Sequence, residues 1–144
     1  MLVMAIGAAA DLTPFSVWDE DARAASPLWV QRWIIFMLCT FFAGLFFVRT
    51  QTAARWIVAS VVASHLASAT ILLVGGPAAL TIGAIAINHI VFWTTAAVYL
   101  AIYGAPIEPA PLYQAWRSLM VAVIAVSLCF DVRDAAIFLL TAPA

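Results

Sequence analysis

The chain has 144 residues, of which 67% are hydrophobic and 9% are charged, and its formal net charge is −1. Soluble domains are about 45 to 50% apolar and about 25% charged, and a soluble fold of this length has too little interior to bury so much apolar surface. The composition therefore excludes an ordinary soluble domain and predicts a chain surrounded by a lipid bilayer. The small net charge gives no reason to expect a nucleic-acid partner.

The N-terminal segment is apolar but does not have the length of a membrane span. Residues 1–12 are too few to cross a bilayer, and they lack the basic start of a secretory signal peptide, so we do not expect a cleaved leader. Residues 13–25 follow as a short predicted helix in which Phe15, Trp18 and Ala22 share one face. Because that face lies opposite acidic residues, the pattern predicts an interfacial helix on the membrane surface.

Long apolar runs predict the membrane-spanning helices. A hydrocarbon layer of about 30 Å needs about 20 apolar helical residues to cross it. Runs of this kind occupy residues 28–48, 56–74, 79–102 and about 115–140. A helix satisfies its own backbone groups in lipid, so the sequence predicts an all-α, polytopic integral membrane protein. We expect a four-transmembrane-helix bundle that forms one membrane domain over 1–144.

The fourth run has two interpretations, because the apolar residues 119–130 are followed by the charged stretch "DVRD" and then by further apolar residues. In one interpretation the helix begins near Leu112 and ends at Asp131. In the other, which we favour, it runs from Ser118 to Leu140 and carries charges inside one leaflet. Charged side chains are costly in lipid, so these are expected to face protein or a polar cavity.

The arginines predict the orientation of the chain in the membrane. Arg49 and Arg55 flank the first loop and Arg117 follows the third, whereas the Gly-Gly-Pro loop at residues 75–77 has no charge. Loops rich in arginine stay in the cytoplasm, so both termini are expected on the periplasmic side. Compact loops and a lysine-free composition rich in alanine and arginine indicate a bacterial cytoplasmic (inner) membrane.

Two histidines lie on either side of the Gly-Gly-Pro turn. His65 and His89 are each 12 residues from Pro77, which places both about 18 Å from the turn along antiparallel helices. We expect them at equal depth near the bilayer midplane. The pair has three functional interpretations, which are ligands of a haem or another metal, a proton relay, and hydrogen bonding to a quinone or lipid. The structural alternative is a hydrogen bond to a neighbouring helix.

Small and polar side chains predict the packing of the second and third spans. Ser64 and Ser68 belong to a ridge of serines at four-residue spacing, which lets another helix approach closely. We predict that Asn88 donates a hydrogen bond across the bundle to Ser64 or Ser68. Trp93 lies four residues after His89 and therefore on the same helix face. It is expected to pack in the interior, with stacking on a bound aromatic ligand as the alternative.

A charge cluster links the predicted first and fourth spans. Arg32 lies near the start of the first, and Asp131, Arg133 and Asp134 lie near the end of the fourth. A charge inside a membrane must find a partner, so Arg32 is predicted to pair with Asp131 or Asp134, and Arg133 to join the network. The paired cluster would hold the two helices together or form the outer mouth of a polar path to the histidines. The alternative is that the charges lie exposed at the membrane surface without a role.

Three functions are compatible with these features. The leading hypothesis is an interaction subunit that forms a homo-oligomer or joins a larger membrane complex through the serine ridge and the aromatic residues of the first span. One alternative is a haem b electron-transfer protein with His65 and His89 as ligands. The other is a proton or ion conductor that uses these histidines with Asp131 and Asp134. No triad, phosphate loop or zinc motif indicates an enzyme.

Overall fold

The computed structural model describes residues 27–76, 79–106 and 110–141. This part of the chain is helical and contains no strand. Its elements, in chain order, are α3 (Leu28–Ala43), the short 3-10 helix η1 (Gly44–Phe47), α4 (Thr52–Gly75), α5 (Ile82–Tyr103) and α6 (Pro111–Thr141). The predicted interfacial helix at 13–25 lies outside the described residues.

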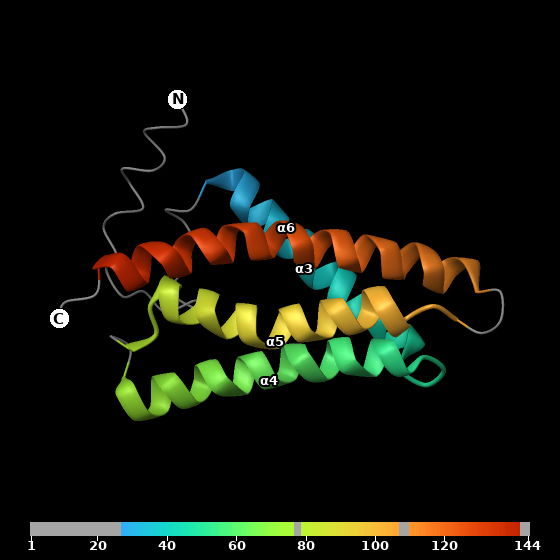
Figure 1. The fold of residues 1–144 in the computed structure, drawn as a ribbon, viewed down its shortest axis with the longest axis horizontal. Coiled ribbons are helices and arrows are strands. Elements are labelled where there is room, and N and C mark those ends of the chain that lie inside the picture. The colour runs from blue at the N-terminus through green and yellow to red at the C-terminus, as the bar shows by residue number, and fades with distance from the viewer. Residues whose placement is uncertain (1–26, 77–78, 107–109, 142–144) are drawn as a thin grey trace.

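Helices α4, α5 and α6 run side by side with α5 in the middle, and α3 crosses behind them obliquely (Figure 1). Consecutive helices alternate in direction, so α4 and α6 run the same way on either side of α5. The short connections after α4 and after α5 enforce this arrangement. As a result, α5 touches a neighbour on both sides, whereas much of α3 and α4 stays exposed.

Among the described residues, three helical segments are long and apolar enough to cross a membrane. They are Leu28–Phe47, Thr52–Gly75 and Ile82–Tyr103, in agreement with the first three predicted spans. Helix α6 is not among them, so a count of four spans is not established by length and composition. A continuous helix over Pro111–Thr141 nonetheless contains the favoured prediction for the fourth segment, because it passes through Asp131 without a break.

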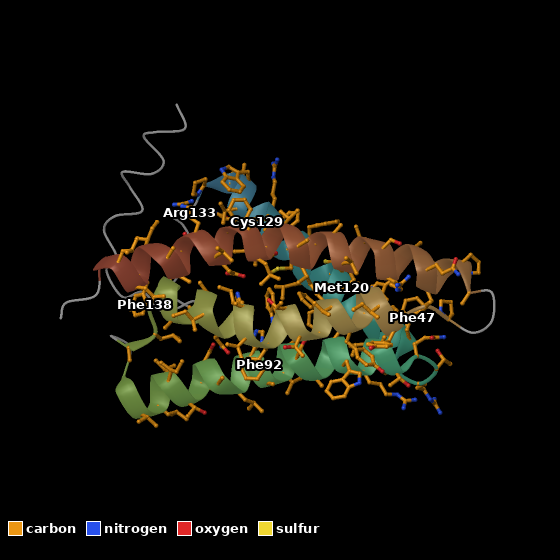
Figure 2. The ribbon with its side chains drawn as sticks, in the orientation of Figure 1. Phe47, Phe92, Met120, Cys129, Arg133 and Phe138 are labelled. Atoms are coloured by element: carbon orange, nitrogen blue, oxygen red, sulfur yellow. The ribbon has the colours of Figure 1, made fainter. Side chains whose placement is uncertain are left out.

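The buried core joins the second half of α5 and the first half of α6 to the end of α3 and the start of α4. Met120 of α6 is fully buried, whereas Arg133 further along the same helix is exposed (Figure 2). The core residues are Phe41, Ala53, Ala54, Ile57, Trp93, Ala96, Leu100, Tyr113, Trp116, Met120, Val123 and Ile124. This cluster is apolar except for the Tyr113 hydroxyl and the two indole N–H groups.

The contact of α3 with α6 depends on a change of helix type at Gly44. The Gly44 N–H bonds the carbonyl of Phe41 in place of that of Thr40, so the Thr40 carbonyl is free to accept from Nε1 of Trp116 at 2.9 Å. A Cβ on Gly44 would lie 2.7 Å from Cζ2 of Trp116. Glycine is therefore required here for close approach of the indole.

Two of the arginines used to predict the orientation bind the ends of helices. Near the end of α5, Arg117 donates from Nε to the carbonyl of Leu100 at 2.8 Å and from Nη2 to the carbonyl of Ala101. Nε of Arg55 donates to the carbonyl of Val48 just after η1 at 2.7 Å. The last carbonyls of a helix lack intrahelical partners and carry partial negative charge. The positions of these two arginines therefore have a structural explanation that does not depend on the predicted orientation of the chain in the membrane.

Candidate functional site

The polar contacts of the bundle are centred on α5, and the first of them joins α5 to α4. Asn88 is buried, and its Nδ2 donates to the backbone carbonyl of Ser64 at 2.7 Å and to Oγ of Ser68 at 2.8 Å. The predicted hydrogen bond is thus confirmed, with both serines as partners. The serine ridge explains the geometry, because small side chains allow the amide to reach a helix backbone.

The second polar contact joins α5 to α6. Nδ1 of His89 lies 3.3 Å from Oδ1 of Asp131, and the side chains are 21% and 15% exposed. Consecutive helical residues are about 100° apart around the axis. Asn88 and His89 therefore face different neighbours although they are adjacent in sequence, and together they tie the central helix to both flanking helices.

Trp93 supports the imidazole of His89 from the same face of α5. The two rings are stacked with centroids 3.8 Å apart and an angle of 13° between their planes. Trp93 is buried and also packs on Phe41 of α3, with centroids 5.2 Å apart. The indole thus packs in the interior, between the imidazole of His89 and the ring of Phe41.

His65 is not brought into this site. Its Nδ1 bonds the carbonyl of Val61 in its own helix at 2.8 Å, and the side chain is exposed. The contact between Asn88 and Ser64 places the two histidines at similar depth, but His65 is turned away from the α5 side of α4. One chain therefore does not hold a haem between His65 and His89.

The position of His89 along its helix also differs from the sequence prediction. Helix α5 begins at Ile82 rather than at residue 79, so His89 is seven residues, or about 10 Å, from its start. The helix is 22 residues long, about 33 Å at the same rise. The His89 and Asp131 pair thus lies in the third of α5 nearest the α4–α5 connection.

The predicted pairing of Arg32 with Asp131 or Asp134 is wrong. Asp131 faces α5 and contacts His89, and Oδ1 of Asp134 lies 3.7 Å from Nε of Arg133. Arg32 lies instead beside a surface hollow of α6 that includes Phe130. Phe130 and Asp131 are neighbours in sequence, but the turn of about 100° between them points one at α3 and the other at α5.

Three buried side-chain polar atoms in the described part of the chain have no hydrogen-bond partner there. They are Oδ1 of Asn88, Nε1 of Trp93 and Oδ2 of Asp131. An unsatisfied buried group costs about 1 to 3 kcal/mol. All three belong to residues that make the polar contacts around α5. The buried side-chain atoms without a partner in the described residues are therefore concentrated in this region.

Asp131 and His89 together are able to hold a proton. Asp131 and His89 form either an ion pair or a neutral pair that shares one proton, and the free Oδ2 of Asp131 is a further acceptor. In the described residues, no three His, Cys, Asp or Glu side chains gather as a metal site. Sequence reasoning missed the pair because His89 was matched with His65, not with α6.

Over the residues that the structure describes, the protein is all-helical with three helices able to cross a membrane, and polar side chains link α5 to its neighbours. Comparison with protein-family models, curated proteins and solved structures finds no match for the chain. The function must therefore be inferred from the chain itself.

Proposed function

We propose that this chain is a four-span protein of a bacterial cytoplasmic membrane, with both ends on the periplasmic side, that acts as an interaction subunit. It associates with copies of itself or with a larger membrane complex. The observation that carries the proposal is the exposed imidazole of His65 within α4. An imidazole inside a bilayer is costly unless it is paired or hydrated, and such residues normally face protein or water.

The bonding of His65 supports this reading of α4. The carbonyl of Val61 only accepts, so Nδ1 of His65 carries the proton in that contact. In the neutral imidazole Nε2 is then an acceptor, and it is available to a donor on another chain. The surrounding surface, which we call the α4 outer face, is exposed and otherwise apolar. It consists of Val62, His65, Leu66, Ala69 and Leu73.

The orientation of two charged residues of α6, Arg117 and Asp131, supports this helix as the fourth span. Asp131 is directed at His89 and Arg117 at the carbonyl of Leu100, so both are turned toward α5. Apolar side chains such as Val132 and Leu139 are exposed on the other sides. The 31 residues of α6 measure about 46 Å, which exceeds the hydrocarbon thickness of about 30 Å and leaves room for polar ends.

We expect His65→Leu to weaken association in mild detergent by about 3- to 30-fold. This range corresponds to the 0.6 to 2 kcal/mol of an interhelical hydrogen bond inside a membrane. Sedimentation equilibrium would measure self-association, and co-purification would measure binding to another chain. Thr95→Val on α5 is the control, because its hydroxyl is exposed and bonds its own helix at Val91. A wild-type chain that is monomeric and purifies alone would contradict the proposal.

Proton transfer is a second candidate, favoured by the free Oδ2 of Asp131 beside His89. Asp134 lies three residues further along α6, on a similar face, and extends the polar groups toward the helix end. In the other direction the interior is apolar, with Leu100, Met120 and Ile124 fully buried. Within one chain the polar residues therefore reach Asp131 from one side only, and a complete proton path would need an assembly of chains.

Proton flux into liposomes tests this second candidate. If Asp131 accepts the proton, reconstituted protein should dissipate a pH gradient faster than protein-free liposomes, and Asp131→Asn should reduce that flux at least tenfold. A pH-sensitive dye trapped in the liposomes reports the rate. Thr95→Val is the control, because its exposed hydroxyl bonds only its own helix at Val91. Wild-type flux no greater than that of empty liposomes would rule out conduction and leave the pair as a contact between α5 and α6.

A further inference from the structure

A hollow of about 390 Å³ lies on the surface between the first half of α3 and α6. We call it the α3–α6 hollow, and its lining residues are Trp29, Arg32, Trp33, Phe36, Val126 and Phe130. The residues from α3 are spaced three and four apart, so they form one face of that helix. Those from α6 are four apart and form the facing wall.

The aromatic walls of the hollow are packed against one another. The rings of Trp29 and Phe130 have centroids 6.1 Å apart and so connect α3 with α6. Those of Trp33 and Phe36 are 5.8 Å apart along α3. These separations lie in the range of favourable aromatic pairs. The hollow is therefore a shaped apolar surface with one end nearer the start of α3.

Arg32 gives the hollow its charge. Asp131 contacts His89 and Asp134 contacts Arg133, so Arg32 has no ion-pair partner among the residues that the structure describes. Arg32 lies four residues from the start of α3, about 6 Å along the axis, and two tryptophans flank it. Tryptophan is enriched at the level of the lipid headgroups, which places the guanidinium where a phosphate lies.

We propose that the α3–α6 hollow binds an anionic phospholipid. The guanidinium of Arg32 contacts the phosphodiester through paired N–H donors, a geometry that favours arginine over lysine. One acyl chain runs deeper along Phe36 and Val126. Charge complementarity selects the occupant, because a zwitterionic lipid brings its own cation while an anionic lipid supplies the counter-charge that Arg32 lacks. The inference depends on α3 lying in the membrane, as in the proposed function.

Native mass spectrometry tests the proposal. The full chain is reconstituted with equal amounts of phosphatidylglycerol and phosphatidylcholine, extracted in mild detergent, and the lipids retained per chain are counted. We expect about fivefold enrichment of phosphatidylglycerol, the effect of one basic residue at an anionic surface. Arg32→Gln should return the ratio to that of the bulk lipid, and Arg32→Lys should give an intermediate ratio. Arg133→Gln, at the exposed end of α6, should keep the enrichment.

Three results would overturn the proposal. The first is a wild-type lipid ratio equal to the bulk, and the second is the same enrichment in Arg32→Gln as in the wild type. The third is enrichment that appears only when Asp19, Glu20 and Asp21 are replaced by Asn, Gln and Asn. In that case the chain's own acidic segment, and not a lipid, would occupy the hollow in the wild type. The same spectra count the chains in each complex, so a failure of lipid selection is distinguished from a failure of the proposed association.

Discussion

Asp131→Ala is expected to lower the free energy of unfolding by about 1 to 3 kcal/mol, because it leaves His89 without its partner on α6. Removing one member of a fully buried ion pair costs about 3 to 5 kcal/mol. The expected loss is smaller here, since the His89 and Asp131 side chains remain 21% and 15% exposed. Thermal unfolding in mild detergent would measure it, with the two proteins compared in the same buffer.

Asp134→Ala is the matched control for this experiment. Asp134 lies on the same helix, but its contact with Arg133 is 3.7 Å long and its partner is 45% exposed. Exposed pairs contribute about 0 to 1 kcal/mol, so this variant should unfold close to the wild-type temperature. Equal losses in the two variants would show that the contact between His89 and Asp131 has no special weight in joining α5 to α6.

Trp93→Ala is expected to have the largest effect of any substitution considered, about 3 to 5 kcal/mol. Truncation of a buried tryptophan loses its apolar burial and leaves a cavity. Trp93 is only 3% exposed, and it connects α3 to α5 by packing on Phe41 while it supports the ring of His89. Thermal unfolding in detergent measures the loss.

Trp93→Phe separates the packing of this side chain from its polarity. Nε1 of Trp93 is buried and has no partner among the described residues, so phenylalanine removes an unsatisfied donor while it keeps most of the aromatic surface. We expect a loss well below that of the alanine variant. If the phenylalanine variant were as unstable as the alanine variant, Nε1 would have a hydrogen-bond partner that stabilises the native state, and the assignment of Trp93 to packing would fail.

Part of the site followed from spacing along the chain. Asn88 and the serines at 64 and 68 lie on either side of a short turn, and the four-residue spacing puts both serines on one helix face. Two antiparallel helices joined by such a turn have few ways to pack, so the hydrogen bonds of Asn88 to both serines were predictable. The position of Trp93 on the same face as His89 follows in the same way from one helical turn, whereas the stacking of the two rings was not predicted.

The contacts between more distant helices did not follow from spacing. The charge on Arg32 and on Asp131 indicated that each needs a partner, but not which one. A rotation of α6 by one residue, about 100°, would exchange Asp131 for Phe130 at the α5 interface. That rotation is decided by packing, including the fit of Trp116 against Gly44 and its bond to the Thr40 carbonyl.

The sequence alone was sufficient to predict helices in the described residues, three of the four expected membrane spans, and the link that Asn88 makes between two of them. Apolar run length and helical periodicity are local properties, and a short turn extends them to one neighbouring helix. The tertiary structure alone decided that His89 belongs with Asp131 and not with His65, and that Arg32 borders an aromatic hollow. Such choices depend on how each helix is rotated about its axis, which is set by the packing of all the helices together.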